Sequence, residues 1–462
     1  MRALLCKTEP IPRDTRTKLD FPFDVPRAAG HLCDMLRYCT VRGNVSEFVR
    51  FEGYLLKTYE NVAKHCSFER VGDVGDKCGF GVIFKLDGSG AGNKSVVLMS
   101  HYDVVPANSA DWDFEPFSGR IKDGRIQGRG AVDTKCTLAA VMESLDVLLG
   151  TGFRPEADLY LCFAGDEETD SLGAVKIVEL LQERGVRPYL VLDEGGGVLR
   201  GQSFGIDGHC AMVGIAEKGL MNIEFTAKSA GGHTSVPNTD NPVDTIGKVI
   251  RVVNNDLFPF VLTTPMRKTL AAVKRIAPIA PRILVTNIDI LGGFIKKYIC
   301  RVQPELAAMT QSVCHVTQVS GSNAHNVVPS SASALANIRV ISDVSCDTEF
   351  ARIKRALRGV DVDVKLCETR EPSKVSLTSG EGWDKVSAAV HSVWDGTAVI
   401  PFVMLGATDS ASYSPVSDSI YRFTPGKMDT ATRKGVHGVN ESLSLVTFGE
   451  MCEFYIKLIK TL

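Results

Sequence analysis

The chain has 462 residues, of which 44% are hydrophobic and 23% charged, and its formal net charge is -2. Its length allows two domains with large cores, and its near-neutral charge gives no reason to expect a nucleic acid or an anionic membrane as a partner. No apolar run reaches the roughly 20 residues that span a bilayer, and the N-terminus lacks the apolar core of a signal peptide, so we expect a cytosolic protein.

The first part of the chain predicts scaffold elements. From Phe23 to about Ala63, apolar residues recur at helical spacing, which predicts two helices with a break near Gly43. Residues 79–86 then predict a strand. The short, β-branched run at 95–99 is typical of a strand that is buried on both faces of a sheet.

His101 and Asp103 follow this buried strand directly. Because alternate residues of an extended backbone point to the same side, the Asp103 carboxylate can orient the His101 ring while the other ring nitrogen binds a metal ion. Asp133 comes at the start of a predicted helix, 135–149, where a carboxylate can coordinate a cation. Each feature alone also fits an ordinary hydrogen bond or a helix cap.

Two further predicted strands end in acidic residues. The strand at 158–164 precedes Glu167 and Glu168, and the next strand precedes Asp193 and Glu194. Adjacent carboxylates on near-extended backbone point in opposite directions, so one of the first pair can bind metal while its neighbour carries protons. An acidic turn at the start of a helix is the alternative. Three buried strands that each deliver His or carboxylate groups at their carboxyl ends predict a carboxylate-rich metal site.

The hydrophobic pattern changes at about residue 217. From there to about residue 368, strands with one exposed face and helices indicate an inserted α+β domain. Its predicted strands are 220–227, 283–286, 332–340 and 360–366, and its predicted helices are 241–254 and 346–357. Residues 1–216 and 369–462 would together form the first, α/β domain, to which the returning chain adds helices at 382–394 and 445–460.

A series of motifs supports these assignments. They are S-H-Y-D-V-V-P, G-R-G-A-V-D-T-K, G-D-E-E-T, L-D-E-G-G, G-G-H-T-S, N-V-V-P and V-H-G-V-N-E. By these motifs and their order, the sequence from about residue 25 onward resembles the M20 family of metallopeptidases, and within it the branch of carboxypeptidase S and the N-acyl-amino-acid hydrolase PM20D1. The resemblance implies a three-layer α/β/α catalytic domain with two zinc ions and an inserted α+β lid that mediates dimerisation.

The resemblance also implies a set of metal ligands. Asp133 would bridge two Zn²⁺ ions, with His101 and Asp193 completing one site and Glu168 and His437 the other. Mn²⁺ and Co²⁺ are the alternative ions for such a donor set. Branches of the family differ over which acid of the L-D-E-G-G stretch binds metal, and we expect Asp193 rather than its neighbour Glu194.

Other residues would act on the substrate. By resemblance, Glu167 is the general base, which takes a proton from water and hands it to the leaving amine, and Asp103 supports His101. His233 of one subunit would reach into the partner's site and steady the developing oxyanion. The groups that would hold the free carboxylate of the substrate are Asn326, Arg339 and the backbone of Gly406.

We therefore expect a di-zinc hydrolase that cleaves an amide next to a free carboxylate, acting on peptides as a carboxypeptidase or dipeptidase. A deacylase of N-acyl amino acids is the first alternative, and it differs only in what the pocket beyond the scissile bond accepts. An inactive binding or scaffold protein on the same fold is the second, and the presence of every candidate ligand and of the base argues against it. The expected assembly is a homodimer formed through the insert.

Overall fold

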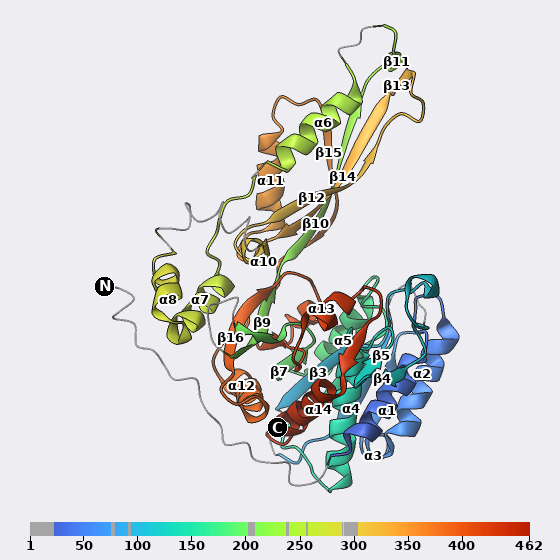
Figure 1. Ribbon diagram of the computed structural model, residues 1–462, viewed down its shortest axis with the longest axis vertical. Helices are drawn as coiled ribbons and strands as arrows, with labels where there is room; N and C mark the ends of the chain where they lie inside the picture. The colour runs from blue at the N-terminus through green and yellow to red at the C-terminus, as the bar shows by residue number, and fades with distance from the viewer. Residues whose placement is uncertain are drawn as a thin grey trace.

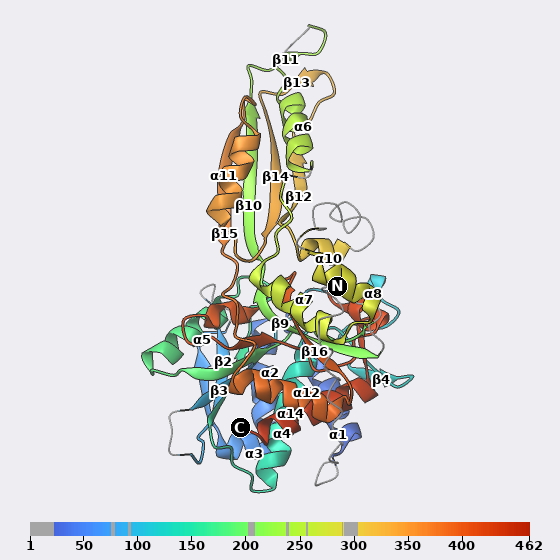
Figure 2. The same cartoon turned by 90° about the vertical axis from the view of Figure 1, so that its left-hand side faces the viewer.

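The computed structural model describes residues 23–74, 79–90, 94–201, 208–236, 240–255, 257–288, 290 and 304–462. The N-terminal residues considered above for a targeting signal lie outside these ranges. The described residues form a body built on a nine-stranded sheet, from which an extension built on a four-stranded sheet projects (Figures 1 and 2). This architecture confirms the predicted α/β fold with two domains. Among the described helices, none is long and apolar enough to cross a membrane.

The sheet of the body is mixed. Its strands follow the order β1-β2-β6-β3-β7-β17-β9-β16, and β8 pairs with β9. Their bounds are β1 Ser67–Val71, β2 Gly81–Leu86, β3 Ser95–His101, β6 Asp158–Ala164, β7 Pro188–Asp193, β8 Gly197–Arg200, β9 His209–Glu217, β16 Ala398–Met404 and β17 Ile420–Arg422. Strand β3 lies between β6 and β7 and is parallel to both. The carboxyl ends of these three strands therefore meet at one edge of the sheet.

Helices pack on both faces of this sheet (Figure 1). The helices of one layer are α1 Val25–Leu36, α2 Val45–Thr58, α3 Glu60–His65, α4 Lys135–Gly150, α12 Glu381–Val393 and α14 Leu445–Ile459. The other layer contains α5, Leu172–Glu183, and the 3-10 helix Asp409–Tyr413. In β3, Val96 and Leu98 face the first layer, and Val97 and Met99 face the second. Burial on both faces explains the continuous apolar run in the sequence.

A small sheet links the segment before Asp133 to the segment after His437. Its strands are β4 Arg120–Lys122, β5 Arg125–Gln127 and β18 Ser442–Ser444, and the neighbouring short elements are α13 Thr430–Gly435 and the 3-10 helix Ser109–Asp111. Ser442 in β18 pairs with Gln127 in β5. Two stretches that are more than 300 residues apart in sequence are thus held side by side close to the predicted metal ligands.

The extension consists of a sheet in the order β12-β14-β10-β15 and two helices. Their bounds are β10 Gly219–Lys228, β12 Val313–Ser320, β14 Ser331–Val340, β15 Asp363–Arg370, α6 Pro242–Val253 and α11 Cys346–Ala356. Alternate residues of β10, such as Ile223 and Phe225, are fully buried in the core shared with these helices. At the far end of the extension, β11 Gly232–His233 pairs with β13 Val327–Val328 (Figure 1).

Part of the span predicted as one insert packs on the body. Helix α7, Thr264–Ile276, buries Val273 in a cluster with Met212 of β9 and Ile400 of β16. Helix α8, Ile279–Thr286, follows beside it, and α10, Pro304–Ala308, leads back to the extension (Figure 1). The strand predicted at 283–286 is therefore wrong, because this apolar run belongs to a helix. The amphipathic α7 covers the edge strand β16, which would otherwise expose unpaired backbone groups.

Candidate metal centre

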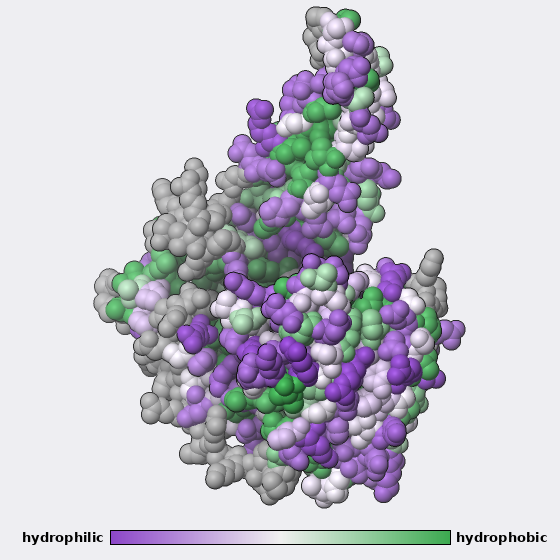
Figure 3. Space-filling view, turned by 45° about the vertical axis from the view of Figure 1, so that its right-hand side comes forward, coloured by the Kyte–Doolittle hydropathy of each residue, from purple (hydrophilic) through white to green (hydrophobic). Residues whose placement is uncertain are grey.

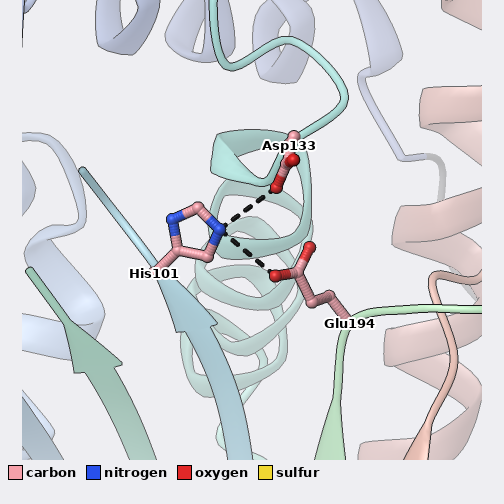
Figure 4. Close-up of side chains that lie close together, drawn as sticks. All are labelled: His101, Asp133 and Glu194. Carbon is pink, nitrogen blue, oxygen red and sulfur yellow. Dashed lines mark hydrogen bonds and ion pairs between the residues drawn. The ribbon is translucent and has the colours of Figure 1, made fainter. Parts of the chain in front are cut away.

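The topology of the body brings the predicted acidic residues and histidines together. His101 is the last residue of β3, and its register partner in β6 is Ala164, three residues before Glu167. Asp193 is the last residue of β7, and Glu194 follows it. Asp133 precedes α4, whose N-terminus lies at the same edge (Figure 4). Because the three strands are parallel neighbours, the residues that follow them share one site.

A first cluster consists of His101, Asp133 and Glu194 (Figure 4). The Nε2 atom of His101 lies 3.1 Å from Oδ1 of Asp133 and 3.2 Å from Oε1 of Glu194. The Nδ1 atom of the same ring lies 3.0 Å from the backbone oxygen and 3.3 Å from Oδ1 of Asp103. One ring nitrogen thus faces Asp103, and the other faces two carboxylates.

The preference for Asp193 in this cluster is corrected by the structure. Its Oδ2 atom accepts a hydrogen bond of 3.1 Å from the backbone N–H of Ser410, which belongs to the 3-10 helix Asp409–Tyr413. Glu194 takes the place beside His101 instead. The physical reason is the alternation of side chains along extended backbone, which sends these two neighbours in opposite directions.

A second cluster consists of Asp133, Glu168 and His437. The Nε2 atom of His437 lies 3.0 Å from Oδ2 of Asp133 and 3.0 Å from Oε2 of Glu168. Asp133 therefore takes part in both clusters, with a different oxygen in each. Within each cluster, the candidate ligand atoms all lie within 4.8 Å of one another. Imidazole and carboxylate groups in this arrangement suit Zn²⁺, and a carboxylate shared between two groups is the pattern of a two-metal site.

Asp103 and Glu167 belong to neither cluster. The carboxylate of Asp103 accepts hydrogen bonds from the backbone N–H groups of Glu167, at 3.2 Å, and Glu168, at 3.0 Å. It thus holds the acidic turn after β6 as well as the His101 ring. The Oε2 atom of Glu167 lies 3.9 Å from Nε2 of His101, and the residue lines the same cavity as Asp133 and His437.

The ionisation of these groups reflects an excess of buried negative charge. Burial and the carboxylate of Asp133 raise the pKa of Glu194 to about 7, against the opposing effect of His101. Hydrogen bonds to Asp133 and Glu168 raise the pKa of His437 to about 10. Burial, opposed by His101 and reinforced by Asp409, raises the pKa of Glu167 well above its usual value. Cations are what would neutralise such a cluster, and the donor set therefore fits a metal centre.

The predicted substrate-binding residues are not gathered at this centre within one chain. His233 and Asn326 lie at the far end of the extension, where the backbone oxygen of Asn326 accepts a hydrogen bond of 3.4 Å from Thr234. Arg339 lies in β14 opposite Leu220. Gly406 lines a cavity next to the metal centre.

Two buried acidic residues near the centre, Glu441 and Asp409, have no role in the sequence analysis. Glu441 is fully buried and accepts hydrogen bonds from the backbone N–H groups of Gly130, Val132 and Asp133. The V-H-G-V-N-E motif contains it, so its place in a motif was the available signal. Asp409 is 4% exposed, and neither of its carboxylate oxygens has a hydrogen-bond partner among the described residues.

Two cavities adjoin at the centre. The first, of about 360 Å³, is lined by Asp133, Glu167, Glu194 and His437. The second, of about 750 Å³, has a mostly apolar wall, whose residues include Leu199, Met212, Met309, Phe402, Met404 and Leu405. The space-filling view shows a hollow at the junction of body and extension (Figure 3). A ligand at the acidic cavity can therefore extend an apolar group into its neighbour.

Comparison with known proteins agrees with this geometry. The model of peptidase family M20/M25/M40 matches residues 97–461. The chain is 28% identical, over 420 residues, to the probable carboxypeptidase S-like 2 of Dictyostelium discoideum, which covers 90% of this chain and 79% of that relative. It is 29% identical, over 385 residues, to the N-fatty-acyl-amino acid synthase/hydrolase PM20D1 of Xenopus tropicalis. That match covers 83% of this chain and 75% of the relative.

Solved structures share the fold. An M20 family metallo-carboxypeptidase, Sso-CP2 from Sulfolobus solfataricus, superposes with a TM-score of 0.65 at 18% identity and covers 94% of this chain and 98% of its own. Human carnosine dipeptidase 1 superposes with a TM-score of 0.67 at 14% identity, and the match covers 95% of this chain and 96% of the dipeptidase. The family model matches most of the length of the chain. The chain therefore belongs to peptidase family M20/M25/M40 and is a metal-dependent peptidase or amidohydrolase.

Proposed function

We propose that the protein is a di-zinc hydrolase that cleaves an amide next to a free carboxylate, as a carboxypeptidase or dipeptidase. The observation that carries this proposal is the position of Asp133, whose two oxygens belong to two separate clusters of candidate ligands. One ion would be held by His101, Asp133 and Glu194, and the other by Asp133, Glu168 and His437. Mn²⁺ and Co²⁺ suit the same donors.

When bound, such ions would acidify water and polarise the carbonyl of the amide. The chain itself supplies the proton carrier. Glu167 lines the cavity without being part of either cluster, and its raised pKa brings it closer to the value that suits a general base near neutral pH. It would accept a proton from water and pass it to the leaving nitrogen. Asp103 keeps Glu167 in place through the backbone of the turn.

The apolar cavity favours a second candidate, an N-acyl-amino-acid hydrolase. A cavity of about 750 Å³ with a wall of Met, Leu and Phe side chains is suited to a large apolar group, whether a side chain or an acyl chain. The PM20D1 relatives carry the name N-fatty-acyl-amino acid synthase/hydrolase. An inactive scaffold is disfavoured because each of the two clusters holds three candidate ligands and Glu167 lies beside them.

We also propose a homodimer in which His233 of one subunit completes the site of the other. The support is its place at the far end of the extension, exposed and remote from the metal centre of its own chain. Changing His233 to Ala should lower activity strongly in a dimer and leave the zinc content unchanged. Sedimentation would report the assembly. A cytosolic location remains a prediction.

One experiment tests the proposed reaction directly. The purified protein is analysed for metal, and it is then assayed with dipeptides and N-acyl amino acids, with and without a chelator. Two equivalents of zinc and chelator-sensitive cleavage of one substrate class would support the proposal and choose between peptidase and deacylase. Protein that stays inert after addition of Zn²⁺ or Mn²⁺ would contradict it.

A further inference from the structure

Helix α13 is anchored on one side and presents an arginine to the site on the other. The carboxylate of Asp429 caps the helix by accepting a hydrogen bond of 2.7 Å from the N–H of Thr432. Arg125 binds both residues, through Oδ2 of Asp429 at 3.4 Å and Oγ1 of Thr432 at 3.0 Å. One turn further along the chain from Asp429 is Arg433, four residues before His437. The helix thus has a fixed orientation relative to the metal centre.

Arg433 lies where the acidic and the apolar cavities meet. It lines both of them, together with Gly196, Met404 and Met428. Among the described residues that line the acidic cavity, it is the one Lys or Arg. The same wall contains His437, a candidate metal ligand, and the carboxylates of Asp133, Glu167 and Glu194, which would repel a substrate carboxylate. With His437 engaged as a ligand, Arg433 is the guanidinium that a free carboxylate would meet here.

The guanidinium of Arg433 already holds a carboxylate. Its Nη2 atom donates a hydrogen bond of 2.7 Å to Oε1 of Glu305 in α10, which lines the apolar cavity. The side chains of the pair are 51% and 73% exposed. An ion pair with this exposure contributes little to stability and can exchange partners at low cost. Glu305 thus occupies the position that a carboxylate ligand would take.

Arg339, which the family resemblance suggests for this task, is placed differently. It lies in β14, half-buried, where burial and the nearby guanidinium of Arg370 lower its pKa. It lines neither of the two cavities. Arg433, and not Arg339, is therefore the arginine that lines the cavity of the metal centre.

We propose that Arg433 is a specificity-determining residue that binds the free carboxylate of the substrate, and that Glu305 competes with the substrate for it. This inference rests on the proposed cleavage next to a carboxylate. It assigns the recognition of the substrate to the body of the enzyme as well as to the extension. Substrates with a neutral amide in place of the carboxylate gain nothing from Arg433.

Binding measurements separate this role from catalysis. In a zinc-loaded Glu167→Gln background, in which turnover is blocked, calorimetry compares N-acetylphenylalanine with its primary amide. Arg433→Met should weaken binding of the acid roughly 10- to 100-fold, as expected for loss of a charge-assisted hydrogen bond, and change binding of the amide less than about twofold. Arg433→Lys should retain part of the affinity, because it keeps the charge but loses the planar fork.

Two matched variants complete the test. Glu305→Gln should tighten binding of the acid, because it removes the competing carboxylate. Lys434→Met removes an exposed cation of the same helix that lines neither cavity, and it should leave binding of the acid unchanged. Equal loss of acid and amide binding in Arg433→Met, a loss no greater than in Lys434→Met, or a background protein that does not prefer the acid would each overturn the inference. Hydrolysis by the zinc-loaded wild-type protein reports separately on the proposed function.

Discussion

Arg129 and Glu441 form a buried ion pair, with 2.6 Å between Nη1 of the arginine and Oε2 of the glutamate. The other terminal nitrogen of Arg129 donates a hydrogen bond of 2.8 Å to the backbone oxygen of Gly438. Glu441 in turn accepts from the backbone of Asp133 at 3.1 Å. The pair therefore ties the loop that carries Asp133 to the loop that carries His437, so one interaction sets the spacing of two candidate ligands.

Glu441→Gln is expected to impair both stability and metal binding. The side chain of Arg129 is 4% exposed, and the variant leaves its guanidinium without the buried counter-charge. Removing one partner of a buried ion pair lowers the free energy of unfolding by roughly 3–5 kcal/mol. Loss of a group that orients a ligand typically lowers metal affinity about 10- to 100-fold. Denaturant unfolding of the metal-free protein and competition with a zinc chelator measure the two effects.

The control for this variant is Glu69→Gln. Glu69 pairs with Arg184 at the surface, where both side chains are 40% exposed, and loss of such an exposed pair should cost less than about 1 kcal/mol. If Glu441→Gln were as mild as the control, the pair would not hold the two loops together.

Glu167→Gln should abolish turnover and leave the zinc content unchanged. The amide is nearly isosteric with the carboxylate but cannot take a proton from water, and loss of a general base typically lowers kcat by about 10²- to 10⁴-fold. Steady-state kinetics and metal analysis of the same preparation test both halves of the prediction. Glu179→Gln, an exposed change on the neighbouring helix α5, is the matched control. Retained activity would remove Glu167 from the role of base.

The sequence predicted the strands that form the centre because their apolar runs and their acidic ends are local features. The run at 95–99 and its parallel neighbours were sufficient to place His101 and Glu167 at one edge. Local features could not decide between Asp193 and Glu194. The alternation of side chains along a strand shows that the two point in opposite directions, but it does not show which of them faces His101. Likewise, the apolar run at 283–286 fits a strand and a helix equally well, and its surroundings in the fold decide.

Glu194 and Asp193 should therefore respond differently to neutral substitution. Glu194→Gln replaces a candidate ligand of the first cluster, and we expect the protein to bind about one equivalent of zinc instead of two. Asp193→Asn preserves a side chain that can still accept a hydrogen bond from Ser410, and it should bind both ions. Zinc titration of the two purified variants decides the matter. The reverse result would return the ligand role to Asp193.

The stability of the metal-free protein and its zinc affinity should change in opposite directions with pH. The pKa of His437 is raised from its ordinary value of 6.5 to about 10 by Asp133 and Glu168. A raised pKa means that the protonated histidine stabilises the folded state fully below pH 6.5 and that this contribution is lost as the pH rises towards about 10. Zinc needs the neutral ring, so its affinity should increase through the same window.

The variant His437→Gln isolates this effect from other titrating groups. Thermal unfolding in the presence of a chelator should show a smaller decline in Tm between pH 6.5 and 10 for the variant than for the wild-type protein. Calorimetry of zinc binding in buffers of different ionisation enthalpy should show that the wild-type protein releases a proton that the variant does not. If both proteins lost stability equally across this range, the proton on His437 would not be what balances the charge of Asp133 and Glu168 in the absence of metal.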